Sequence, residues 1–303
     1  MSNRTTGFSN LLAPELSNVF FNKYKQWMDE YTAIFNVESS TRSYEEDVEI
    51  AGLGAMQSKA EGIGITYDEP FQSGRKRYTH STFGLGFRVT DELYNDDLYG
   101  IIKKMPQALA RSAHQTIEVN AANVLNNAFN TTLQAGLDGI QLISTAHKRV
   151  DGTGGPYSNR LSTDSDLSVT SLQSAIQLME GTTDDRDLNL NIKPKLLVIT
   201  PNLKWVAREL LKSEYKPHTA DNEINAFRDE DLSYTVNHYL TDTNAWFLLA
   251  DKADHYLKFY WRQKLKFDND DDFDTGDAKF KATMRLAVGF TNWRGIVGTS
   301  GSS

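Results

Sequence analysis

The chain has 303 residues, contains no cysteine and carries a formal net charge of −8 at pH 7. The length suits two ordinary domains or one elongated one. The lack of cysteine excludes disulfides, thiolate nucleophiles and zinc–thiolate sites. The acidic balance argues against a protein that grips nucleic acid, since such proteins are usually basic. It remains compatible with one that surrounds nucleic acid without adhering to it.

No run of residues is apolar enough to cross a membrane, so we expect no membrane partner. The first ten residues, MSNRTTGFSN, lack the apolar region of a signal peptide, and we expect none.

Residues 14–35 form the first predicted helical segment, and it is rich in aromatic side chains. Its apolar residues keep helical spacing and comprise Val19, Phe20, Tyr24, Trp27, Tyr31 and Phe35. A short helix with so many aromatics needs a partner surface. Two interpretations stay open. The segment packs on its own domain, or it is an arm whose Phe20, Tyr24 and Trp27 contact a neighbouring subunit.

Residues 41–89 are predicted to contain an extended hairpin. Phe83, Leu85, Phe87 and Val89 alternate with smaller or polar residues, which is typical of a strand. We expect residues 65–71 to pair with it through a turn at 72–74. Such a hairpin has too few apolar residues to be stable alone.

A basic tip is expected at Arg75, Lys76 and Arg77. These three charges are either a solvated turn or the donors of salt bridges to an acidic face of a neighbouring copy.

Residues 90–129 are the segment around which the chain is predicted to be organised. Its apolar residues recur at helical steps: Leu98, Ile102, Met105, Leu109, Ala113, Ile117, Val124 and Ala128. The polar residues between them suit a solvated or partner-facing side: Lys103, Lys104, Gln107, Arg111, His114 and Glu118. We expect a short acidic helix, a break, and a long helix with Pro106 in its first turn.

The next hundred residues are predicted to form a compact α/β lobe. Residues 152–158 are a Gly-rich loop, and they lack the ending of a phosphate-binding loop. Ser168 or Thr170 caps a helix that runs through Met179. Residues 195–200 then form a buried strand, and a helix follows to about Ser213. From residue 232 onward, aromatic and β-branched runs predict an antiparallel sheet that packs against the long helix.

No catalytic, cofactor or metal site is predicted, and we expect no enzyme. The six histidines show neither an HExxH motif nor a paired spacing, and we interpret His147 as structural. The acidic run 268–279 fails as an EF-hand, because Phe273 stands where glycine is needed and Lys279 where glutamate is needed. A solvated acidic turn is favoured. A weak cation site at Asp268, Asp270 and Asp272 stays open.

Five stretches, taken together and in order, resemble the major capsid protein of tailed bacteriophages, near the Mu-type major head subunits. They are residues 87–129, 138–159, 167–180, 193–215 and 288–299. The resemblance implies an α+β fold shared with encapsulins and the floor of herpesvirus capsids. Its parts would be an N-terminal arm (1–55), an extended loop (56–89), a peripheral domain of spine helix and sheet (90–133 and 232–298), an axial domain (134–231) and a tail (299–303).

The resemblance also implies a structural function. Copies would form hexamers and pentamers of an icosahedral shell around packaged double-stranded DNA, in the virion, after assembly in the host cytoplasm. Besides the chain itself, the expected partners are a separate scaffolding protein and a portal protein, with a decoration protein as a further candidate. The alternative is an encapsulin-like, non-viral compartment. A hydrolase based on residues 268–277 is disfavoured, because no nucleophile–base pair accompanies them.

Overall fold

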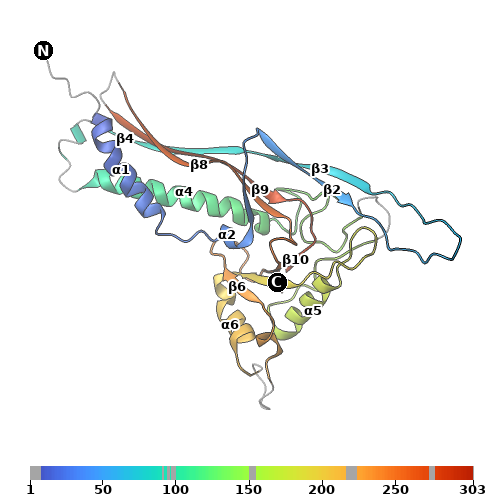
Figure 1. Ribbon diagram of the computed structural model, residues 1–303. Helices are drawn as coiled ribbons and strands as arrows, with labels where there is room; N and C mark the ends of the chain where they lie inside the picture. Colours follow the sequence, from blue (N-terminus) through green and yellow to red (C-terminus); the bar gives the residue numbers. More distant parts are fainter. Residues whose placement is uncertain are drawn as a thin grey trace.

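The computed structural model describes residues 8–90, 92–93, 96, 100–149, 155–215, 224–272 and 277–302. The molecule is elongated (Figure 1). A long sheet and a long helix lie side by side at one end, a two-stranded hairpin projects at the other, and a lobe lies below their junction. The architecture is α+β, which confirms the predicted fold class.

The main sheet has four strands in the order β1-β8-β9-β4. They are β1 (Asn36–Ser39), β8 (Leu257–Asp271), β9 (Ala278–Phe290) and β4 (Ser81–Val89). The long β8 and β9 form an antiparallel ladder, β4 extends it on one side, and β1 joins β8 in parallel on the other. The strand prediction for Phe83–Val89 is thus confirmed, but its partner is β9 and not residues 65–71.

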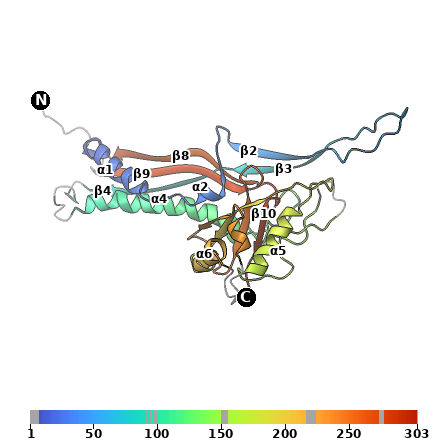
Figure 2. The same ribbon diagram turned by 60° about the horizontal axis from the view of Figure 1, so that its bottom comes forward.

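Helix α4 (Ile101–Asn126) runs along the main sheet, as Figure 2 shows. Gly100 precedes it with φ +64°, a left-handed conformation that few other residues adopt easily. Ile117, Val124 and Leu125 pack with Phe259 and Met284 of the sheet. Full burial of such side chains stabilises the fold by about 1.5–3 kcal/mol each.

Two predictions for this helix are wrong. It begins at Ile101, so Pro106 lies beyond the first turn, inside the helix, and is buried there. His114 and Glu118, predicted to face solvent or a partner, are 6% and 0% exposed. The buried face of the helix is therefore wider than the stripe of apolar residues indicated.

The aromatic N-terminal segment packs on α4 within the same chain. It forms α1 (Phe8–Tyr24) and the short α2 (Tyr31–Ile34). Leu16 and Phe20 are buried between α4 and the main sheet. The strand that follows, β1, then joins this segment to the sheet edge.

The hairpin consists of β2 (Tyr44–Ala51), β3 (Phe71–Thr79) and the connection 52–70, which we call the distal loop. Sequence analysis expected the hairpin later in the chain, with its turn at 72–74. The nearest paired residues of the two strands, Ala51 and Phe71, are separated by the nineteen residues 52–70. Polar residues dominate both strands, so local alternation did not reveal the pairing.

The lobe contains a second four-stranded sheet in the order β10-β7-β5-β6. Its strands are β10 (Ile296–Thr299), β7 (Trp246–Ala250), β5 (Pro194–Ile199) and β6 (Ser233–Val236). The helices are α5 (Val169–Glu180) and α6 (Lys204–Lys212), with the 3-10 turns η1 (Pro201–Leu203) and η2 (Ala226–Arg228). A capping box between Ser168 and Ser171 starts α5, which confirms the predicted cap at Ser168.

The lobe sheet corrects the expectation for the C-terminal third. Strands β6, β7 and β10 were predicted to join the sheet on the long helix, but they surround β5 of the lobe. Only β8 and β9 from that third belong to the main sheet.

Among the described residues, no helix has the length and apolar character needed to cross a membrane.

Gly295, in the turn between β9 and β10, offers a test of this packing. Its φ is +77°, and a Cβ there would lie 2.4 Å from the carbonyl oxygen of Asp254. Gly139 has φ +75° but open space around it. We expect Gly295→Ala to lower the free energy of unfolding by about 2–5 kcal/mol, because left-handed strain and overpacking add. Gly139→Ala should cost about 1–2 kcal/mol. Denaturant titration measures both, and equal costs would contradict the assignment of a steric clash.

Candidate functional site

The hairpin exposes an unusual number of large apolar side chains. Met56 is fully exposed and Tyr67 is 87% exposed, and five further residues of β2, β3 and the distal loop are about half exposed or more: Ile50, Leu53, Ile63, Ile65 and Phe71. Figure 2 shows that this part of the chain projects away from the body of the molecule. A concentration of exposed apolar groups marks an interaction site. The hairpin is therefore the candidate functional surface.

The base of the distal loop is braced by the lobe. Arg186 donates to the carbonyl oxygens of Gly52 (3.2 Å) and Glu69 (2.6 Å), and its guanidinium lies 3.5 Å from Asp68. The same guanidinium stacks on Phe71 at 4.7 Å. The two ends of the loop are thus tied to one side chain, while the apolar residues between them remain exposed.

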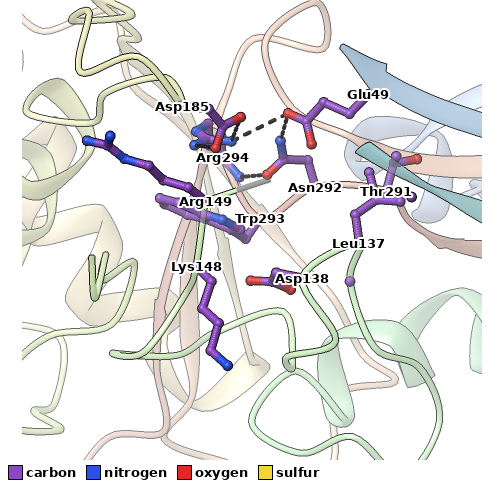
Figure 3. A pocket seen from close by; sticks show the side chains of 12 residues that line it. Glu49, Leu137, Asp138, Lys148, Arg149, Asp185, Thr291, Asn292, Trp293 and Arg294 are labelled. Atoms are coloured by element: carbon purple, nitrogen blue, oxygen red, sulfur yellow. Dashed lines mark hydrogen bonds and ion pairs between the residues drawn. The ribbon is translucent and has the colours of Figure 1, made fainter. Parts of the chain in front are cut away.

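A buried charge network fixes the root of the hairpin (Figure 3). Arg294 donates to Asp185 (3.0 Å) and to the carbonyl oxygen of Thr183 (2.9 Å), and its guanidinium lies 3.4 Å from Glu49 of β2. Asn292 also donates to Glu49. Burial raises the pKa of Glu49, and the neighbouring Arg294 opposes that rise. The network joins the hairpin, the lobe and the β9–β10 turn.

A second set of contacts holds the root to the main sheet. The hydroxyl of Tyr78 in β3 donates to Thr291 (2.6 Å), which in turn donates to Asp47 of β2 (2.6 Å). Lys258 of β8 lies 2.9 Å from the same carboxylate. Desolvation raises the pKa of Tyr78, so its phenol stays protonated as a donor. Both hairpin strands are therefore anchored to the body at their roots.

The root surrounds a hollow of about 230 Å³, and the side chains that line it hold neighbouring segments together. Beside it, His147 is held by Asp138 (2.7 Å) and Asn159 (3.0 Å) and stacks on Trp293 with ring centroids 4.5 Å apart. Its geometry fits the structural role expected for His147. Thr291, whose side-chain hydroxyl lines the hollow, donates to Asp47, and Glu49, Asp185 and Arg294, which also line it, belong to the buried charge network. These contacts hold the hairpin, the lobe and the β9–β10 turn together.

The three predicted basic residues do not form a tip. They lie in β3, opposite β2, and their partners belong to the same chain. Arg77 lies 2.7 Å from Glu46, Arg75 lies 4.0 Å from the same residue, and Lys76 donates to the carbonyl oxygen of Ala135 at 2.6 Å. They lie in a strand and not in a turn, and salt bridges from their side chains to a neighbouring copy stay a prediction.

The three predicted aromatic contacts are divided between the interior and the surface. Phe20 is completely buried against Leu109 and Ala113, so its side chain has no exposed area. Tyr24 and Trp27 are half-buried, with rings 6.0 and 5.7 Å from the His114 ring. Only Tyr24 and Trp27 present part of their surface for a contact with another subunit.

The acidic run offers little to a cation in its described part. Asp268 lies 2.7 Å from Lys266, and Asp272 pairs with Lys279, so two of the three candidate ligands have lysine partners. Residues 273–276 lie outside the described residues, as do 152–154 of the Gly-rich loop.

The exposed residues of the distal loop were not recognised as a site from the sequence. Ile63, Ile65 and Tyr67 stand among glycines and polar residues without any period, so only their exposure in the structure identifies them.

Comparisons with known proteins identify the family. The family model described as "Phage capsid protein" matches residues 74–298, about three quarters of the chain. No curated protein matches the sequence. The capsid structure of the cyanophage P-SCSP1u has a TM-score of 0.61 at 11% identity and covers 89% of this chain and 87% of its own.

Two further structures have the same fold. The procapsid of bacteriophage JBD30 has a TM-score of 0.54 at 16% identity, covering 99% of this chain and 77% of its own. A virus-like particle from Pyrococcus furiosus has a TM-score of 0.52 at 12% identity, covering 94% and 98%. The chain therefore belongs to the phage capsid protein family, as a structural major capsid protein of the virion shell.

Proposed function

We propose that copies of this chain assemble into hexamers and pentamers that close into an icosahedral shell around packaged double-stranded DNA. The observation that carries the proposal is the projecting hairpin, whose large apolar side chains are mostly half exposed or more in their own chain. Each of these side chains would be removed from water by contact with a neighbouring subunit. Apolar burial between chains would then add to the modest burial within a single chain. The net charge of −8 supports a wall to which DNA does not adhere.

The division into parts also remains our interpretation. We propose α1 and the following connector as an arm, the hairpin as the extended loop, α4 with the main sheet as the peripheral domain, and the lobe as the axial domain at the capsomer centre. Because β6, β7 and β10 lie in the lobe sheet, the axial domain takes these strands from beyond residue 231. Assembly would occur in the host cytoplasm, with a separate scaffolding protein and a portal protein, and a decoration protein as a further candidate.

The second candidate is an encapsulin-like compartment, which the resemblance to the virus-like particle from Pyrococcus furiosus favours. Its TM-score of 0.52 is lower than the 0.61 of the cyanophage capsid. Since the fold is shared, the cargo distinguishes the two: nucleic acid in a phage head, protein in a compartment. A hydrolytic function has no supporting geometry in the described residues.

Negative-stain electron microscopy with analytical ultracentrifugation of the expressed chain tests assembly. We expect closed shells, tubes or discrete capsomers, and the shell diameter then bounds the copy number. Expression with the phage's scaffolding protein repeats the test under assembly conditions. A chain that stays monomeric in both experiments would refute the proposal.

Substitutions in the distal loop test whether its apolar side chains contribute to assembly. We expect Tyr67→Asp, or Ile63→Asp, to reduce the yield of shells at least about tenfold, because a charge would have to be buried at the subunit contact. The thermal unfolding of the isolated subunit should change little, since both side chains are exposed within one chain. Gln57→Asp adds the same charge at a polar position of the same loop, and it should assemble normally. Equal yields from all three variants would contradict a role for the apolar loop.

The root network gives a separate prediction. Arg294→Met would leave Asp185 and Glu49 without their cation in a buried position. We expect it to lower the free energy of unfolding by about 3–5 kcal/mol. The same substitution at Arg77, whose side chain is 56% exposed, should cost less than about 1 kcal/mol. Denaturant titration of the soluble subunits measures both. A cost for Arg294→Met no larger than that for Arg77→Met would show that the network does not hold the hairpin.

A further inference from the structure

Three potential ligands meet where the N-terminal segment crosses α4. Asp29 lies in the connector between α1 and α2, while His114 and Glu118 lie one turn apart on α4. The Nε2 atom of His114 is 3.6 Å from Asp29 and 3.9 Å from Glu118. One ligand atom of each residue lies within 4.8 Å of the other two.

His114 is buried without satisfying its ring nitrogen. The residue is 6% exposed, and its Nε2 has no hydrogen-bond partner although it points toward both carboxylates. The rings of Tyr24 and Trp27 lie beside the imidazole and shield it from water. A buried polar atom without a partner costs free energy, so a native protein usually satisfies such an atom with another group.

The observed separations suit a bound cation better than hydrogen bonds. Distances of 3.6 and 3.9 Å are too long for an N–H···O hydrogen bond. Two ligands of a tetrahedral ion with bonds of about 2.0–2.1 Å are roughly 3.4 Å apart. Movements of a few tenths of an ångström would bring Nε2 to that spacing from each of the two carboxylates.

Glu118 is already oriented for such a role. Its two oxygens accept hydrogen bonds from the backbone N–H groups of Glu30 (2.8 Å) and Tyr31 (3.1 Å), and its side chain is 0% exposed. Contacts of this kind fix metal-binding carboxylates in position. Within the described residues, neither Asp29 nor Glu118 has a lysine or arginine at ion-pair distance.

We propose that Asp29, His114 and Glu118 bind a transition-metal dication, with Zn²⁺ as the best fit, completed by water. Imidazole nitrogen together with carboxylate oxygen suits Zn²⁺, whereas Ca²⁺ and Mg²⁺ require sets of oxygen ligands. The Asp29 side chain is 36% exposed and so provides an entry path from the surface. The ion would tie the connector of the N-terminal segment to the spine helix, a link that does not depend on the proposed assembly function.

Metal analysis of the full-length chain tests the proposal. Protein purified without metal is incubated with Zn²⁺, dialysed, and analysed by mass spectrometry for bound metal. We expect one retained Zn²⁺ per chain, and a rise in Tm of roughly 5 °C that neither Ca²⁺ nor Mg²⁺ reproduces. Asp29→Asn, a partly exposed connector position, and His114→Gln should each weaken Zn²⁺ affinity at least about tenfold.

The matched control is His238→Gln. His238 is exposed and lies 2.6 Å from Glu30, so this histidine–carboxylate pair is an alternative site for adventitious zinc. We expect its removal to leave the retained Zn²⁺ unchanged. No retained zinc in the wild-type chain, retention lost in His238→Gln, or affinity unchanged in both Asp29→Asn and His114→Gln would overturn the proposal. Circular dichroism of each metal-free variant separates lost binding from lost folding.

Discussion

The burial of one face of α4 is the interaction on which the rest of this elongated molecule depends. Its C-terminal half contributes Ile117, Val124 and Leu125 to a cluster that also contains Phe259 of the main sheet and Phe247 of the lobe. One helix thus supplies core to both sheets, and its N-terminal half holds α1 through Leu109 and Ala110. An extended shape leaves little interior, so α1, the main sheet and the lobe all rely on this shared helix.

The hairpin illustrates how a projecting element is held without a core of its own. Its outer half buries no large apolar cluster, and a two-stranded hairpin alone is marginally stable. Its direction is therefore set at the root, by the charges around Arg294 and by the Tyr78–Thr291–Asp47 contacts. Ionic and hydrogen-bonded anchoring suits this position, because the apolar side chains remain available for contacts with another subunit.

Local patterns in the sequence predicted single elements well and their partners poorly. The cap at Ser168, the strand 195–200 and the apolar stripe of α4 follow from neighbouring residues, and the structure contains them. The pairing of β4 with β9 and of β2 with β3 depends on contacts between distant segments, which no local period encodes. The partners of Arg75–Arg77 could not be predicted either, because they depend on which strand lies opposite β3.

His114 and Glu118 show a different limit of sequence analysis. As polar residues beside an apolar stripe they indicated a solvated face, yet the N-terminal segment crosses there and covers them. The burial of Glu118 is tolerated because the backbone N–H groups of Glu30 and Tyr31 satisfy its carboxylate. The chain therefore uses polar groups at the point where two distant segments must meet in one register. Apolar packing alone would allow α2 to slide along α4, whereas a carboxylate that accepts from two adjacent N–H groups specifies a single position.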